Sequence, residues 1–189
     1  DFDVHAGELL ALIGPNGAGK STTFNMVNGQ LPATAGSVRF EGREILGMKP
    51  HAIARLGVGR SFQIAATFAS LTVLQNVQAA LIAHRRRVFS FFSRADAHEP
   101  ERALGLLDLV GMRDQAQRPC SELAYGDVKR RELAMSLAGE PRLLLMDEPT
   151  AGMAPGETQQ VVSVLREVAQ REQVTMVLIE HDMGVVISV

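Results

Sequence analysis

Short hydrophobic runs and longer amphipathic stretches alternate along this chain of 189 residues. Three runs, at residues 9–13, 143–146 and 174–179, are mainly apolar and too short for isolated helices. Such runs are typical of buried parallel strands. Each is followed by polar residues, and the carboxyl ends of parallel strands meet at one edge of a sheet. The pattern therefore predicts an α/β fold with polar side chains gathered at that edge.

The remaining periodic segments predict further elements. Residues 36–44 alternate between apolar and polar positions, which predicts an edge strand with turns, and residues 58–63 predict a strand that ends on Gln63. Thr72 is the expected N-cap of one helix. Apolar residues at helical spacing and flanking glycine or proline residues predict helices over residues 21–28, 50–56, 72–83, 99–110, about 125–138 and 157–170.

Composition limits the class of protein. The chain is 46% hydrophobic and 21% charged, which suffices for one sizeable core with a smaller subdomain. The net charge of −2 gives no global basis for nucleic-acid binding, and no apolar run approaches the ~20 residues that span a bilayer. A single cysteine excludes an intrachain disulfide. Because the chain opens on Asp1 and stops within an apolar segment, we expect a fragment truncated at both ends.

A glycine-rich loop carries the clearest chemical signal. It fits the pattern G-x-x-x-x-G-K-[ST] between a predicted strand and a predicted helix, an arrangement that aims backbone N–H groups and a helix dipole at an anion. Lys20 is expected against the β and γ phosphates of a nucleotide, and the Ser21 hydroxyl on Mg²⁺. The predicted phosphate-binding residues are Gly14, Pro15, Asn16, Gly17, Ala18, Gly19, Lys20, Ser21 and Thr22.

Polar residues at the other strand ends complete the predicted site. Asp147 is expected to hold Mg²⁺, and Glu148 to orient or deprotonate a water aimed at the γ phosphate. Gln63 could ligate the metal or its water, and His181 could donate a ring N–H to the γ phosphate. In isolation, Gln63 and His181 are more often hydrogen-bonded side chains at strand ends, and an Asp-Glu pair is often only a polar turn. Beside the glycine-rich loop, the acid pair predicts catalysis.

Residues 85–94 interleave four arginines with three phenylalanines. The stretch is either a surface that docks a partner or a membrane, or the solvated end of a helix leading into a loop.

Five motifs in order resemble those of the ATP-binding subunits of ABC transporters: Walker A, Q-loop, signature, Walker B and H-loop. They occupy residues 14–22, Gln63, residues 123–127, residues 147–150 and residues 179–182. More narrowly, residues 60–63, 123–131 and 179–183 resemble the ATPases of branched-chain amino-acid importers. ATPases that serve urea, amide or lipopolysaccharide transport share these traits.

The resemblance implies a single ABC ATPase domain over residues 1–189. This domain has a P-loop NTPase (RecA-like) core with a parallel sheet, a small antiparallel β part and an inserted helical subdomain at residues 64–125. It also implies a head-to-tail pair of ATPase subunits, each ATP lying between one loop 14–22 and the other subunit's signature. The signature residues are Leu123, Ala124, Tyr125, Gly126 and Asp127.

The other implied partners are transmembrane permease subunits, which the helical subdomain would receive, and indirectly a solute-binding protein. The implied location is the cytoplasmic face of the inner membrane. Four residues depart from the family pattern: Ala124 lacks the usual serine hydroxyl, Tyr125 replaces a glycine, Asp127 replaces a glutamine, and Ala154 stands where aspartate is usual.

Two other functions remain open from the residues. One is an ABC-type ATPase that acts on DNA repair, chromosomes or ribosomes, although the long coiled coils and tandem cassettes of such proteins are absent from this sequence. The other is a nucleotide-dependent interaction module that does not hydrolyse ATP.

Overall fold

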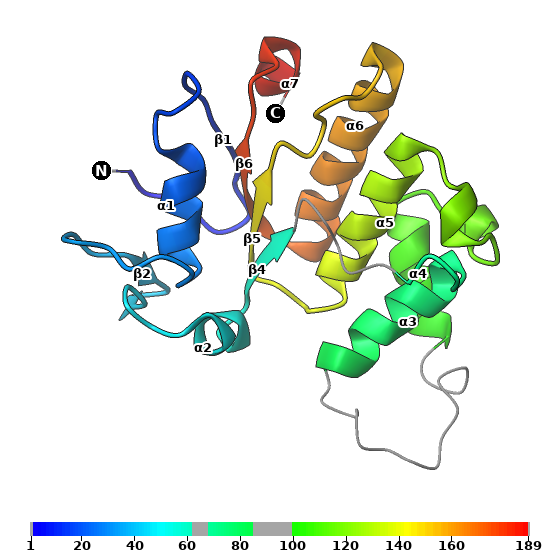
Figure 1. Ribbon diagram of the computed structural model, residues 1–189, viewed down its shortest axis with the longest axis horizontal. Coiled ribbons are helices and arrows are strands. Elements are labelled where there is room, and N and C mark those ends of the chain that lie inside the picture. The colour runs from blue at the N-terminus through cyan, green and yellow to red at the C-terminus, as the bar shows by residue number, and fades with distance from the viewer. Residues whose placement is uncertain (1, 62–67, 85–99, 189) are drawn as a thin grey trace.

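A parallel sheet of four strands organises the protein. The computed structural model describes residues 2–61, 68–84 and 100–188. Its main sheet has the order β1-β6-β5-β4, every neighbouring pair being parallel (Figure 1). The strands are β1 (Leu9–Leu12), β4 (Val58–Ser61), β5 (Leu143–Asp147) and β6 (Thr175–Ile179). The predicted parallel sheet is confirmed, and its strand ends lie at one edge.

Both faces of this sheet are covered. Alternate residues of a strand point to opposite faces, and in β5 Leu145 belongs to one hydrophobic cluster whereas Leu144 and Met146 belong to another. The first cluster includes residues of α1 (Lys20–Val27) and α2 (Pro50–Arg55). The second includes residues of α6 (Pro155–Glu172) and of three further helices. Two-sided burial explains why these strands are apolar throughout.

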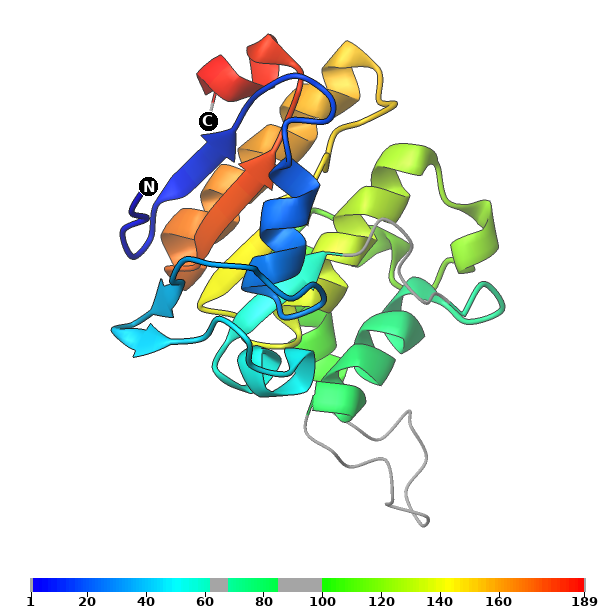
Figure 2. The same cartoon turned by 60° about the vertical axis from the view of Figure 1, so that its left-hand side comes forward.

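The three further helices pack against one another beside α6, as Figure 2 shows. They are α3 (Val73–His84), α4 (Pro100–Leu109) and α5 (Tyr125–Leu137). The expected cap of α3 is present, because Thr72 Oγ1 accepts the N–H of Gln75 at 3.2 Å and Gln75 Oε1 accepts the N–H of Thr72 at 2.9 Å. The extent of the subdomain expected at residues 64–125 stays a prediction, because the described residues omit parts of it.

The small antiparallel β part is confirmed. Residues 36–44, predicted as one edge strand with turns, form a separate antiparallel pair, β2 (Arg39–Phe40) and β3 (Arg43–Glu44). The connecting residues Glu41 and Gly42 have φ values of 48° and 76°. Positive φ at both positions is typical of a tight hairpin turn, which folds the stretch back on itself.

A short last helix, α7 (Met183–Ser188), follows β6 and was not predicted. None of the helices in the described part of the chain is long and apolar enough to span a bilayer.

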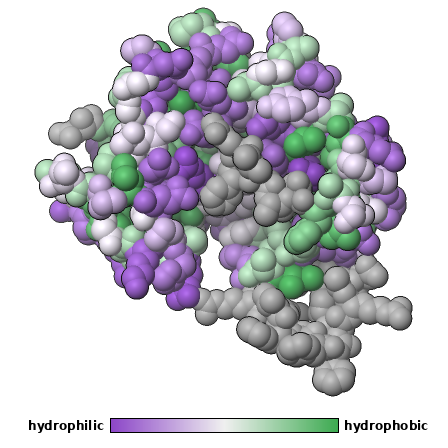
Figure 3. Space-filling model, in the orientation of Figure 1, coloured by the Kyte–Doolittle hydropathy of each residue, from purple (hydrophilic) through white to green (hydrophobic). Residues whose placement is uncertain are grey.

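On the face shown in Figure 3, hydrophilic residues cover most of the side formed by α1 and α2, and apolar residues are more frequent near α3 and α5.

Candidate active site

The loop between β1 and α1 has the backbone shape that its glycines allow. Gly17 and Gly19 have φ values of 81° and 88°, in the left-handed region that L side chains avoid. A Cβ at either position would meet no atom within 4 Å, so the loop surface there is open. The N–H of Ala18 donates to the Pro15 carbonyl at 3.2 Å. The loop therefore bends tightly with its backbone accessible.

Unpaired N–H groups lie where this loop enters α1. The first bond of the helix runs from the Thr23 N–H to the Gly19 carbonyl at 2.8 Å. The preceding N–H groups, those of Lys20, Ser21 and Thr22, have no helical acceptor. Together with the helix dipole, they form the anion-binding end that the sequence predicts.

Lys20 folds back over the loop. Its ammonium donates to the carbonyl oxygens of Gly14 at 2.7 Å and Pro15 at 3.0 Å, and the residue is 9% exposed. An ammonium has three donors, so one is left for an anion in the loop.

Asp147 meets this loop from the end of β5. Its Oδ1 accepts a hydrogen bond from Ser21 Oγ at 3.5 Å, across 126 residues of sequence. Its side chain is 6% exposed. The predicted meeting of the glycine-rich loop with a strand-end carboxylate is therefore present in the fold.

Arg60 holds the other oxygen of this carboxylate. Its Nη2 lies 3.5 Å from Asp147 Oδ2, and its Nη1 donates to Gln30 Oε1 at 2.8 Å and to Asn25 Oδ1. From the sequence, Arg60 was recognised only as part of residues 60–63, which resemble the ATPases of branched-chain amino-acid importers. Its position near the end of a strand, three residues before Gln63, was the signal that could have identified it.

Glu148 and His181 contact each other directly. Glu148 Oε1 lies 3.0 Å from His181 Nε2, and each side chain is 37% exposed. Glu148 has a φ of 49°, and its N–H donates to the Ile179 carbonyl at 2.9 Å. The two residues thus join the ends of β5 and β6 at the open edge of the sheet. Gln63, which was predicted beside them, lies outside the described residues. The arginine and phenylalanine stretch at residues 85–94 lies outside them as well.

A buried carboxylate behind this pair was not predicted. Glu180 is 3% exposed, and its Oε1 accepts the hydroxyl of Thr150 at 2.8 Å and the N–H of Thr150 at 3.2 Å. Its Oε2 faces the N–H of His181 at 3.3 Å. A charged residue at the end of an otherwise apolar strand was the signal in the sequence.

The signature residues lie at the start of α5, apart from α1 in both Figure 1 and Figure 2. Ala124 is the N-cap and makes no side-chain capping bond, and Tyr125 is 50% exposed. The carboxylate of Asp127 pairs with Arg130 within the same helix. No hydrogen bond or ion pair among the described residues joins residues 123–127 to residues 14–22. Within one chain, the structure does not bring these two predicted groups together.

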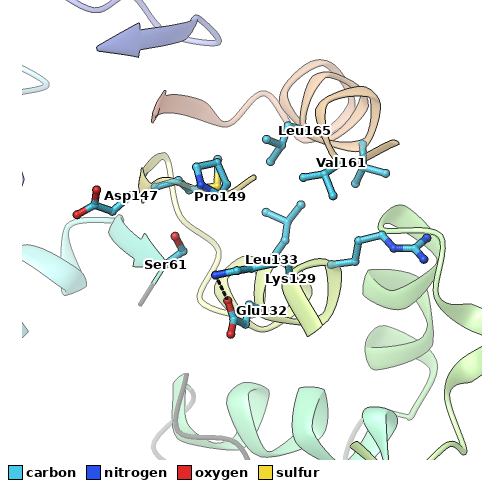
Figure 4. A pocket seen from close by; sticks show the side chains of 11 residues that line it. Ser61, Lys129, Glu132, Leu133, Asp147, Pro149, Val161 and Leu165 are labelled. Atoms are coloured by element: carbon cyan, nitrogen blue, oxygen red, sulfur yellow. Dashed lines mark ion pairs between the residues drawn. The ribbon is translucent and has the colours of Figure 1, made fainter. Parts of the chain in front are cut away.

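A pocket lies beside Asp147, between the ends of β4 and β5 and the helices α5 and α6 (Figure 4). Leu133, Val161 and Leu165 form its apolar wall. Lys129 and Glu132 form an ion pair of 3.4 Å on its other side. Ser61, the last residue of β4, also lines the pocket.

The parallel sheet, the glycine-bent loop capping α1 and the carboxylate at the neighbouring strand end together define a P-loop nucleotide-binding protein. A family model described as "ABC transporter" matches residues 1–151. The chain belongs to the ABC transporter family, and it is an ATP-binding cassette of the kind that hydrolyses ATP to drive transport. The resemblance inferred from the motifs is confirmed.

Two relatives are similar in sequence to this chain over its whole length. The branched-chain amino acid transport ATP-binding protein LivG of Salmonella typhimurium is 37% identical over 197 residues, which cover 100% of this chain and 76% of LivG. BraF of Pseudomonas aeruginosa, with the same description, is 37% identical over 196 residues, covering 100% and 77%. Among solved structures, the ADP conformation of the ATP-binding cassette MJ1267 is similar, with a TM-score of 0.84 at 31% identity, covering 97% of this chain and 74% of that one.

Proposed function

We propose that this chain powers the uptake of branched-chain or other hydrophobic amino acids by hydrolysing ATP at the edge of the sheet where β1, β5 and β6 end. The observation that carries the site is the contact of Ser21 in the glycine-rich loop with Asp147. The substrate class is supported by LivG and BraF, whose names describe branched-chain amino acid transport.

The loop at residues 14–22 binds the triphosphate. Free N–H groups at the start of α1 donate to phosphate oxygens, and the left-handed glycines let the backbone approach them. Lys20 adds a positive charge: two of its donors bind the loop carbonyls, and the third is left for a phosphate oxygen. ATP binding therefore depends on the backbone shape and on one ammonium.

The residues present fit a magnesium ion. Ser21 and Asp147 offer a hydroxyl and a carboxylate oxygen within 3.5 Å of each other, and Mg²⁺ prefers such oxygen ligands. In proteins that bind nucleotides, Mg²⁺ usually takes one or two protein oxygens, and phosphates and waters complete its coordination. When bound, Mg²⁺ neutralises charge on the β and γ phosphates. Gln63 remains predicted as a further ligand.

Glu148 orients or deprotonates the attacking water, and His181 orients Glu148. A neutral His181 can donate Nε2–H to the carboxylate at the observed 3.0 Å. The same N–H can instead donate to the γ phosphate, as the sequence predicts, so the imidazole can exchange partners as ATP is bound and hydrolysed.

ABC cassettes form dimers and work with membrane permease components. In our proposal two copies pack head to tail, because the signature residues lie apart from the loop of the same chain. The N–H groups at the start of α5 would bind the phosphates held by the other copy. Because Ala124 replaces the usual serine, no hydroxyl at that position would contribute. The pair would bind transmembrane permease subunits at the cytoplasmic face of the inner membrane, and through them serve a solute-binding protein.

Two measurements test the proposal. Purified wild-type protein should release phosphate from Mg-ATP, and Lys20→Ala should lose ATP binding. In cells that lack the gene, uptake of labelled leucine should return with the wild-type gene and not with Lys20→Ala. ATP hydrolysis without any uptake of leucine, isoleucine or valine would support the ATPase activity but contradict the proposed substrate class.

A further inference from the structure

Glu180 is a buried carboxylate whose partners are neutral donors. It is 3% exposed, and no lysine or arginine in the described part of the chain pairs with it. Its two oxygens instead accept the hydroxyl and N–H of Thr150 and the N–H of His181, at 2.8, 3.2 and 3.3 Å. Burying a carboxylate is unfavourable unless donors of this kind compensate it. An apolar residue would avoid that cost, so the contribution of Glu180 is to be sought in the donors that it binds.

The donors belong to the two segments that carry the catalytic pair. Thr150 lies two residues after Glu148, and His181 follows Glu180 directly. The same two segments are joined a second time by the bond from the Glu148 N–H to the Ile179 carbonyl at 2.9 Å. Two separate attachments therefore fix the end of β5 against the end of β6.

The backbone of Glu148 needs this support. Its φ of 49° is sparsely populated by residues other than glycine. Such a conformation persists where the surroundings impose it. Here it directs the Glu148 carboxylate to within 3.0 Å of His181 Nε2.

We propose that Glu180 is a positioning residue for ATP hydrolysis. It clamps Thr150 and the backbone of His181, so that the His181 imidazole meets the Glu148 carboxylate at hydrogen-bond distance. The inference rests on the proposed roles of Glu148 and His181. Glu180 itself lies behind the pair and acts through them.

Conservative variants of the clamp give the first test. Glu180→Gln keeps the shape of the side chain, but its NH₂ group then faces the N–H and hydroxyl donors that the carboxylate had accepted. Thr150→Val removes only the Thr150 hydroxyl. We expect kcat to fall roughly ten- to a hundredfold in Glu180→Gln, the range for losing hydrogen bonds to a charged group. In Thr150→Val, which removes one of the three donors, we expect a severalfold fall in kcat. The dissociation constant of Mg-ATP should stay within about twofold, because the loop at residues 14–22 is untouched. Thr150→Ser, which restores the hydroxyl, should recover wild-type kcat.

Glu172→Gln is the matched control, because Glu172 is an exposed glutamate at the end of α6. It should leave kcat and ATP affinity unchanged. If Glu180→Gln does not fold, the Thr150→Val and Thr150→Ser pair carries the test alone, since Thr150→Val conserves the shape of the side chain and Thr150→Ser conserves its hydroxyl.

A double-mutant cycle separates positioning from a merely structural role. If Glu180 acts through His181, adding Glu180→Gln to His181→Ala should lower kcat by less than about twofold further. A full additional loss in that background would overturn the proposal. So would an unchanged kcat in Glu180→Gln, or a loss of ATP affinity equal to the loss of kcat. Wild-type protein that released no more phosphate than Lys20→Ala would instead overturn the proposed function, and this inference with it.

Discussion

Arg60 offers the sharpest test of how the site is held together. It reaches from β4 to the Asp147 carboxylate at 3.5 Å and also to Gln30 and Asn25 near the end of α1. The side chains of Arg60 and Asp147 are 14% and 6% exposed. Among the described residues, replacing Arg60 by alanine would leave Asp147 with the long hydrogen bond from Ser21 and no ion pair.

The cost follows from burial and distance. Removing one partner of a fully buried ion pair costs about 3–5 kcal/mol, and the 3.5 Å separation makes this pair weaker than that. Losing hydrogen bonds between charged groups costs about 1.5–3 kcal/mol. We therefore expect Arg60→Ala to lower the free energy of unfolding by about 2–3 kcal/mol, and Tm by about 4 to 12 °C for a chain of this size.

Urea and thermal denaturation of the purified protein measure this loss. Arg171→Ala is the matched control, because Arg171 pairs with Glu167 on the surface of α6 with side chains 63% and 43% exposed. Exposed pairs of this kind contribute about 0.3–0.5 kcal/mol. The large effect should therefore appear only at Arg60.

A second variant tests whether the charge of Asp147 causes the loss of unfolding free energy in Arg60→Ala. In an Asp147→Asn background the cost of Arg60→Ala should shrink by about 1 kcal/mol or more, because no buried anion is left unpaired. An Arg60→Ala cost no larger than that of Arg171→Ala, or an unchanged cost in the Asp147→Asn background, would refute this reasoning.

Three further predictions follow from the same contacts. Glu148→Gln should keep ATP binding and lower phosphate release by about 10²–10⁴-fold, and turnover at the wild-type rate would show that another group activates the water. Leu107→Ala, at a fully buried position of α4, should cost about 2–5 kcal/mol in urea denaturation, whereas a cost below ~1 kcal/mol would contradict the packing there. The Ser37 hydroxyl, and then the N–H groups of Val38 and Leu46, hold the pKa of Glu44 below its ordinary value. This stabilisation of the hairpin is present above the pKa of an unfolded glutamate and is lost as pH falls through the lowered pKa. NMR shifts of the Val38 N–H should follow that titration, and should not change with acid in Glu44→Gln.

The strands and helices were predictable because their signals are local. The runs at 143–146 and 174–179 are short and apolar, since β5 and β6 are buried on both faces. Thr72 and Gln75 stand at the spacing of a capping box, and α3 begins there. Where the local signal was ambiguous, at residues 36–44, the sequence could not show whether an alternating stretch would join the main sheet or fold back on itself.

By itself, the sequence determined the anion-binding loop at residues 14–22. The glycines that permit its shape, the lysine and the helix that follows are neighbours along the chain, so no tertiary contact is needed to recognise them. The sequence also placed Asp147 and Glu148 at the end of a strand, and the parallel sheet then required them to lie near the loop.

Only the tertiary structure decided which side chains pair at that edge. Arg60 and Asp147 are 87 residues apart, and Thr150 and Glu180 are 30 apart. Many polar residues occupy strand ends, and the choice among them depends on strand order, register and backbone angles such as the left-handed φ of Glu148. These are properties of the packed sheet, because a hydrogen bond or an ion pair is made only when the fold holds both partners close together and suitably oriented.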